Sequence, residues 1–157
     1  AMERREFIAL LGGAAALLPS QTDGAFARPV QTSENEIVGS WSFVSSVNTR
    51  SDGTLVDRWG PNTKGMLMFD GAGNFSQIII GSESRMFGAK TYSAFGSYTF
   101  DATGGNIAMK FTGCSIAKVV GSLQERKIVL LTADELKYIN PLTASGTIAE
   151  VAWKRIV

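Results

Sequence analysis

Histidine is absent from the 157 residues, and cysteine occurs once, as Cys114. Without imidazole the chain can hold no Ser-His-Asp or Cys-His catalytic system, no histidine-bound zinc or haem, and no histidine pH switch. A single cysteine excludes an intrachain disulfide and a cysteine-ligated metal cluster. We therefore expect no metal site and no cofactor, and we assign no catalytic residue.

An excess of one charge is also lacking, because 15 Lys and Arg stand against 14 Asp and Glu, a net charge of +1. Nucleic-acid binding needs clustered basic residues, which the sequence does not have, so we expect no nucleic-acid partner. No apolar run reaches the length of about 20 residues that spans a membrane. With 45% hydrophobic residues the chain can still bury the core of one domain.

The N-terminal segment has the three parts of a secretory signal. Arg4 and Arg5 precede a short apolar run, 7–18, and the small-residue sequence Ala25-Phe26-Ala27 follows. The arginine pair resembles the bacterial twin-arginine export signal. The alternative, an ordinary amphipathic helix, needs a polar face that 7–18 lacks. We expect a signal peptide with an apolar helix over 1–27, a linker over 28–36, and a periplasmic or secreted mature protein.

From residue 37 onward, apolar and polar residues alternate in short segments, which is typical of half-buried strands. Turn sequences rich in Asp and Gly separate these segments. Strands are expected at 37–47, 54–60, 65–70, 75–80, 91–101, 106–113, 125–131, 136–139 and 147–156. An irregular loop is expected at 81–90, while 114–123 fits either a strand or a short helix or loop across one barrel end.

This pattern predicts an all-β domain over 37–157, either a sandwich or a barrel. Consecutive hairpin connections favour a single antiparallel up-and-down β-barrel of about 8–10 strands, since closure removes exposed strand edges. A barrel of eight strands is about the smallest that holds a small ligand.

Two sequences at the ends of this domain resemble the bacterial lipocalin-like domain family: Gly39-Ser40-Trp41 on the first expected strand and Trp153-Lys154-Arg155 on the last. The resemblance extends over 37–157 and includes Gly65-x-Leu67-x-Phe69-Asp70 and Phe95-Gly96-Ser97-Tyr98. It implies a lipocalin-like barrel in which the Trp41 indole closes one end and Arg155, or alternatively Lys154, packs over it through a cation–π contact. That family often carries histidine on the strand that here reads Ile-Ala-Met-Lys-Phe (107–111), so no role that depends on imidazole is transferred.

Seven side chains are candidates to line the barrel lumen and contact a ligand: Phe43, Trp59, Met68, Tyr92, Tyr98, Arg126 and Tyr138. For the aromatic residues, the alternative to ligand contact is packing in the core or against a loop. On the strand expected at 65–70, either the face with Met66 and Met68 or the face with Leu67 and Phe69 points inward. Arg126 lies on an apolar face, where a cation needs a partner. That partner is either Glu150 or a ligand anion, unless Arg126 points outward.

The favoured function is therefore binding of a small, mostly hydrophobic molecule in the lumen. One alternative is a barrel enzyme of the isomerase or cyclase type, which encloses a reactive substrate and uses Tyr, Lys, Asp or Glu for proton transfer. A second is a non-catalytic structural or partner-binding module. The sequence leaves homo-oligomer formation open.

Overall fold

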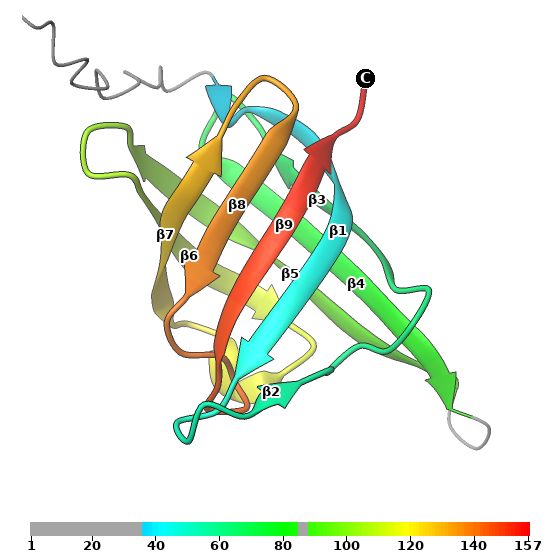
Figure 1. Ribbon diagram of the computed structural model, residues 1–157. Helices are drawn as coiled ribbons and strands as arrows, with labels where there is room; N and C mark the ends of the chain where they lie inside the picture. The colour runs from blue at the N-terminus through cyan, green and yellow to red at the C-terminus, as the bar shows by residue number, and fades with distance from the viewer. Residues whose placement is uncertain (1–35, 85–87) are drawn as a thin grey trace, which may run out of the picture.

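The computed structural model describes residues 36–84 and 88–157. Nine antiparallel strands and a short 3-10 helix, η2 (Ala117–Val119), follow one another along the chain (Figure 1). The strands are β1 (Gly39–Thr49), β2 (Leu55–Val56), β3 (Lys64–Phe69), β4 (Asn74–Ser84), β5 (Gly88–Asp101), β6 (Asn106–Cys114), β7 (Leu123–Leu131), β8 (Glu135–Asn140) and β9 (Ile148–Arg155).

The sheet closes on itself. From β3 to β9 each strand pairs with the next one in sequence, and β1 pairs with both β3 and β9. The two-residue β2 pairs only with the end of β1, so the other eight strands form the wall. The predicted single antiparallel up-and-down barrel is thereby confirmed, and this is the architecture that lipocalins use.

Aromatic and aliphatic side chains fill one half of the barrel. Phe75 and Phe111 meet edge to face at 5.2 Å between ring centroids, and Phe43 meets Trp153 in the same way at 5.5 Å. Fully buried residues from β1, β3, β6, β8 and β9 complete this core, namely Trp41, Leu67, Ile107, Met109, Leu136 and Trp153. This packing occupies the half of the lumen next to Trp41.

The alternation expected in the first strand is broken by an irregularity of register between Phe43 and Ser45. An extra residue in one strand reverses which side chains face inward after it. Ser46 and Asn48 therefore face the lumen, and Val47 is 47% exposed on the outer wall. Strict alternation from Trp41 would have placed Val47 on the buried face, and the irregularity places it outside.

Packing in the barrel core decides which of the two faces of β3 points inward. Leu67 is 0% exposed and Phe69 packs against the Tyr98 ring at 4.7 Å, whereas Met68 is 41% exposed. Because side chains alternate along a strand, burying Phe69 places Met68 outside. The assignment of Met68 to the lumen is therefore corrected.

Two further segments differ from expectation. The segment expected as a loop at 81–90 is largely strand, because β4 continues to Ser84 and β5 starts at Gly88. The strand expected at 54–60 is only the two-residue β2. The segment 114–123, left open between a strand and a short helix or loop, contains the 3-10 helix η2. The signal peptide predicted over 1–27 and the linker up to residue 35 lie outside the described residues. Among the described residues, no helix has the length and apolarity needed to cross a bilayer.

Candidate functional site

One barrel end, the upper end in Figure 1, is closed by Trp41 and Arg155. The Arg155 guanidinium stacks over the Trp41 ring at 4.1 Å from the ring centroid. It donates hydrogen bonds to the carbonyls of Val38 (2.8 Å), Glu36 and Ala133. The Trp41 indole N–H donates to the Ile37 carbonyl at 3.0 Å. These contacts join the start of β1, the β7–β8 turn and the end of β9 in a plug.

Gly39 makes room for this plug. A Cβ atom at position 39 would lie 2.5 Å from Nη1 of Arg155, and the backbone there has a φ of +139°. A side chain is excluded both by the guanidinium and by the conformation. The spacing Gly-x-Trp thus has a physical cause, since the glycine lets the arginine reach the tryptophan.

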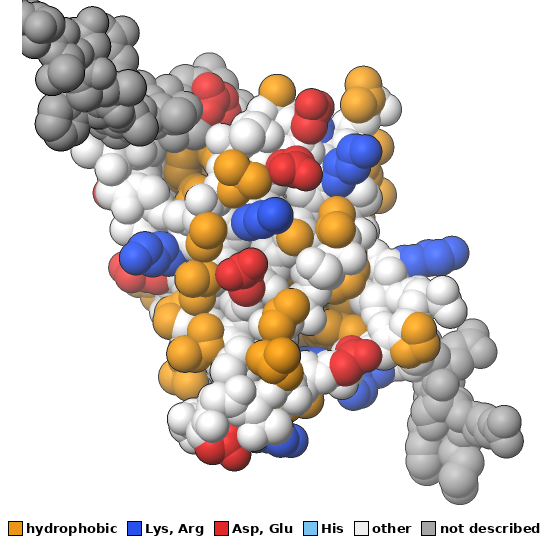
Figure 2. All heavy atoms as spheres, viewed as in Figure 1, with side chains coloured by type: hydrophobic (Ala, Val, Ile, Leu, Met, Phe, Trp, Pro, Cys, Tyr) orange, Lys and Arg blue, Asp and Glu red, His pale blue; other side chains and the backbone are white. Residues whose placement is uncertain are grey.

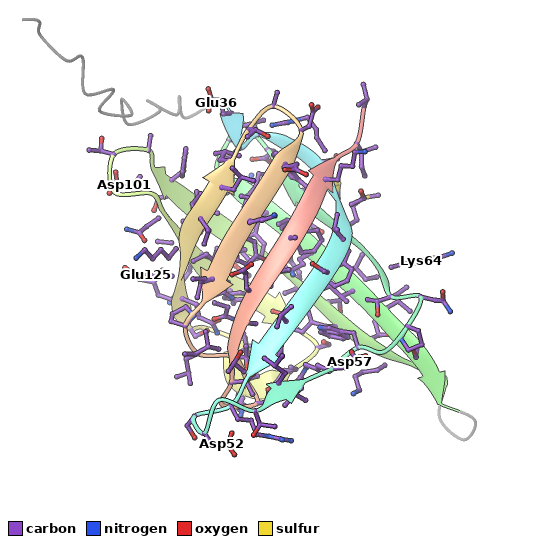
Figure 3. All side chains as sticks on the ribbon, in the orientation of Figure 1. Glu36, Asp52, Asp57, Lys64, Asp101 and Glu125 are labelled. Carbon is purple, nitrogen blue, oxygen red and sulfur yellow. The ribbon has the colours of Figure 1, made fainter. Side chains whose placement is uncertain are left out.

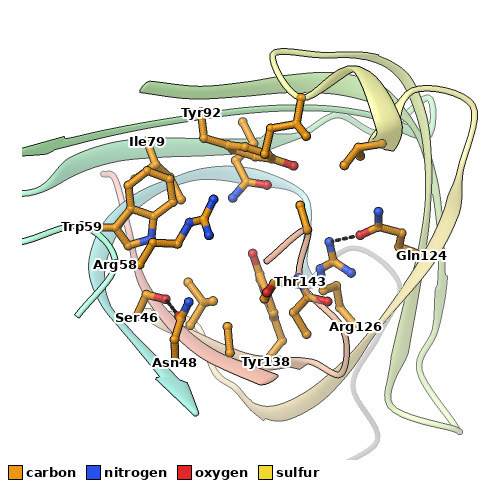
Figure 4. A pocket seen from close by; sticks show the side chains of 17 residues that line it. Ser46, Asn48, Arg58, Trp59, Ile79, Tyr92, Gln124, Arg126, Tyr138 and Thr143 are labelled. Carbon is orange, nitrogen blue, oxygen red and sulfur yellow. Dashed lines mark hydrogen bonds between the residues drawn. The ribbon is translucent and has the colours of Figure 1, made fainter. Parts of the chain in front are cut away.

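A cavity of about 80 Å³ lies at the opposite end of the barrel, where β1 ends and η2 lies. Figure 4 shows the 17 side chains that line it. They come from β1, β4, β5 and β7 to β9, from η2 and the residue before it, and from the loops that precede β3 and β9. A cavity of this size holds several water molecules or a small organic molecule.

Trp59 and Arg58 form one wall of the cavity, and their loop is tied to the neighbouring strands. The Asp57 carboxylate accepts hydrogen bonds from the backbone N–H groups of Trp59 (3.1 Å) and Gly60 (2.7 Å). A Cβ at Gly81 would lie 2.7 Å from the Trp59 carbonyl, so glycine at that position lets the loop lie against β4. The Arg58 guanidinium is 5.5 Å from the centroid of the Trp59 ring.

Arg126 from β7 forms the opposite wall and is only 4% exposed. It donates to the Gln124 side-chain oxygen and to the Glu125 carbonyl, both at 2.9 Å. Glu150, the carboxylate considered as its partner, lies on the outer, exposed face of β9, and Glu125 projects outward from β7 (Figure 3). The Arg126–Glu150 pair is therefore not formed, because inward and outward positions alternate along each strand.

Two phenols line the cavity with Arg126 (Figure 4), and the Tyr138 hydroxyl is hydrogen-bonded to the guanidinium. Burial raises the pKa of the Tyr138 hydroxyl, and the nearby Arg126 charge opposes that rise. Burial, with the neighbouring Cys114 thiol, also raises the pKa of Tyr92, again against the Arg126 charge. For its part, Arg126 has its pKa lowered by burial, with Tyr138 and Tyr92 acting in the other direction. At neutral pH both phenols are protonated and can donate hydrogen bonds.

A row of polar side chains borders the cavity on the β1 and β9 side, and sequence reasoning missed it. The Ser46 hydroxyl donates to the Asn48 amide oxygen at 2.9 Å, and the Asn48 amide donates to the Thr147 hydroxyl at 3.4 Å. Thr147 in turn bonds Thr143 at 2.7 Å between hydroxyl oxygens. Only the register irregularity in β1 turns Ser46 and Asn48 inward, so a strict alternation could not have found them.

The seven candidate lumen residues lie in three places. Trp59, Tyr92, Arg126 and Tyr138 line the cavity. Phe43 packs in the filled half against Trp153. Tyr98 stacks on Phe69, and its hydroxyl donates to the Asp70 carbonyl at 2.7 Å, so Tyr98 supports the closed half instead of the cavity. Met68 is on the outer wall.

The charged side chains that line the cavity are all basic. Its lining includes Arg58 and Arg126, and no Asp or Glu is among its 17 described residues. The described residues also contain no group of three or more His, Cys, Asp or Glu side chains that could hold a metal ion. On the outer face seen in Figure 2, hydrophobic side chains are interspersed with charged ones.

No family model matches the chain, and no curated protein matches it in sequence. Among solved structures it is similar to a redesigned β-barrel, with 14% identity, a TM-score of 0.47 and coverage of 79% of this chain and 95% of that one. It is also similar to a de novo designed fluorescence-activating β-barrel, with 13% identity, a TM-score of 0.47 and coverage of 80% and 100%. A third similar structure is bovine odorant binding protein in complex with a selenium-containing odorant, with 20% identity, a TM-score of 0.46 and coverage of 80% and 74%. At these identities and TM-scores, the likenesses say nothing about what this chain binds.

Proposed function

We propose that this protein is an exported, lipocalin-like barrel that binds a small, mostly apolar molecule in the cavity at its open end. The observation that carries the proposal is the contrast within one lumen. Trp41 and Arg155 plug one end, and a hollow lined by a few polar groups among apolar ones occupies the other. Small-molecule sites have this composition in general.

The apolar part of the lining is large enough to hold a hydrophobic body. Trp59, Ile79, Val119 and Val151 surround the cavity together with the rings of Tyr92 and Tyr138. Burying the apolar surface of a ligand against such walls contributes roughly 25 cal/mol per Å². The polar groups then fix the orientation of the ligand.

Binding is better supported than catalysis. A barrel enzyme needs a group that exchanges protons near neutral pH. The two phenols in the cavity have pKa values shifted upward from 10.0, and no carboxylate from the described residues lines it. These side chains donate hydrogen bonds to a guest but supply no general base.

Export is part of the proposal and rests on the sequence. Arg4 and Arg5, the apolar run 7–18 and the sequence Ala25-Phe26-Ala27 have the order of a twin-arginine signal. A periplasmic or secreted location suits a protein that collects a small molecule outside the cytoplasm. Fusion of residues 1–35 to a reporter that functions only after folding in the cytoplasm and export tests this, and Arg4→Lys with Arg5→Lys should abolish export.

The binding proposal is tested by native mass spectrometry of protein purified without an unfolding step. We expect an additional bound mass that disappears in Ala144→Phe, because Ala144 lines the cavity and a larger side chain there fills it. Ala72→Phe is the matched control, since Ala72 is exposed in the turn before β4. A bound mass that persists in Ala144→Phe would place the ligand elsewhere.

A further inference from the structure

The most unusual group in the molecule is the Arg126 guanidinium. It is 4% exposed, and no Asp or Glu of the described residues pairs with it. A buried cation costs free energy unless an opposite charge or a full set of acceptors compensates it. It donates to the Gln124 amide oxygen and the Glu125 carbonyl, which are both neutral. Its Cζ also lies 5.9 Å from the centroid of the Phe111 ring.

The guanidinium also has unused donors. Arginine carries five N–H donors in a planar fork, and these two hydrogen bonds engage one on each terminal nitrogen. The Tyr138 hydroxyl is a further hydrogen-bond partner of Arg126. Since Arg126 lines the cavity, the donors not engaged by Gln124, Glu125 and Tyr138 are available on that side. A planar fork of this kind matches a carboxylate, whose two oxygens accept parallel hydrogen bonds.

The groups around Arg126 favour an anion with a single charge. The protonated hydroxyls of Tyr92 and Tyr138 donate hydrogen bonds without adding charge, and Figure 4 shows them on the cavity between Arg58 and Arg126. Arg58 contributes a second positive charge from the other wall. Arg58 is only partly buried, so Arg126 is the one buried cation of the described lining, and a carboxylate balances its charge. A phosphate with two charges needs more than one buried cation.

We propose that the guest is a small monocarboxylic acid, held with its carboxylate on Arg126 and its apolar tail against Trp59, Ile79 and Val119. This inference rests on the proposed function, because it names the chemical class of the molecule in the same cavity. It assigns Arg126 as the group that selects the anion, and Tyr138 and Tyr92 as neutral donors to the same carboxylate.

The test compares two probes of nearly the same shape, 4-phenylbutyrate and its uncharged amide 4-phenylbutyramide, by titration calorimetry at neutral pH. We expect the acid to bind about tenfold to hundredfold more tightly than the amide, the range for hydrogen bonds to a charged group. In Arg126→Met this preference should disappear while the amide still binds. Arg126→Lys, which keeps the charge without the fork, should retain part of it.

Lys127→Met is the matched control, because it removes the same charge one residue away on the exposed face of β7. It should leave the preference unchanged, whereas Arg58→Met should reduce it by less than Arg126→Met. Equal affinity of the wild-type protein for acid and amide overturns the inference and leaves the proposed function standing. Binding of neither probe contradicts the proposed function itself. Stronger displacement of the acid by inorganic phosphate than by butyrate assigns the site to a different anion and also overturns the inference.

Discussion

The two ends of the barrel are built from the same kinds of side chain but use them in opposite ways. At the closed end, Arg155 stacks on Trp41 and donates three hydrogen bonds to backbone carbonyls. At the open end, Arg126 has only neutral partners, which are Gln124, the Glu125 carbonyl, the Tyr138 hydroxyl and the Phe111 ring, and it faces a cavity. Arg58 lies near Trp59 on the other wall. The cation at one end is compensated by the protein, and the cation at the other is left for a partner.

This difference indicates where stability and function lie. Groups whose interactions are complete within the chain contribute to folding, whereas a buried cation with spare donors lowers stability until something binds. Substitutions at the two ends should therefore separate the effects on unfolding from the effects on ligand binding.

The largest effect is expected for Trp41→Ala. The indole is 0% exposed and carries both the stacked arginine and a hydrogen bond to Ile37, so its removal should lower the free energy of unfolding by about 3–5 kcal/mol. Trp59→Ala, at the mouth of the cavity, should cost about 1 kcal/mol and weaken ligand binding. Urea unfolding followed by circular dichroism measures the free energy of unfolding of both variants. Equal decreases in that free energy would remove the distinction between the two barrel ends.

Arg155→Met should lower the free energy of unfolding by about 2 kcal/mol, because it deletes the cation–π contact and leaves three carbonyls without their donor. Arg155→Lys should lose less, since an ammonium keeps the charge but cannot reach three carbonyls together. The same urea series checks this, and a Lys variant as unstable as the Met variant would assign the stabilisation to guanidinium geometry alone.

Unlike Arg155→Met, Arg126→Met should not lower the free energy of unfolding. Replacing an uncompensated buried cation with an apolar side chain of similar length should leave the ligand-free protein equally stable or raise its free energy of unfolding by about 1 kcal/mol. Thermal unfolding without ligand measures this. A loss comparable to that of Arg155→Met would mean that Arg126 is a structural residue like its counterpart at the closed end.

The fold was largely predictable because alternation and turn sequences report on strand order, and the Gly39-x-Trp41 spacing reports on the plug. The inner and outer faces were less predictable. The irregular register after Phe43 turns Ser46 and Asn48 inward against the local pattern, and β3 has methionines on one face and Leu67 with Phe69 on the other. Only packing against strands distant in sequence decides between such faces. Arg126 was identifiable as a candidate, but the outward position of Glu150 required the structure.

Alkaline pH should destabilise the open end. The pKa values of Tyr138 and Tyr92 are raised by burial above their ordinary 10.0, so the folded protein holds protons that the unfolded chain releases above pH 10. Their contribution to stability is complete below pH 10 and is lost as the pH rises further. The free energy of unfolding between pH 8 and 11.5 checks this, and Tyr138→Phe should make the decline shallower.

The smallest effect is expected on the outer wall. Met68→Ala should change the free energy of unfolding by less than about 0.5 kcal/mol, because Met68 is 41% exposed. Met109→Ala, a substitution of the same type at a fully buried site, should cost about 2–5 kcal/mol. If Met68→Ala impaired ligand binding, the assignment of the lumen face of β3 would be wrong.

The chain carries its own probes for the central claim, that the guest occupies the open end. Its three tryptophans lie at the plug (Trp41), in the filled middle (Trp153) and at the cavity wall (Trp59). In a nitrogen-15 labelled sample, the three indole N–H signals can be followed by NMR while 4-phenylbutyrate is added. We expect the Trp59 signal to shift most, the Trp153 signal less and the Trp41 signal not at all. A saturable shift of Trp41 without one of Trp59 would contradict the account.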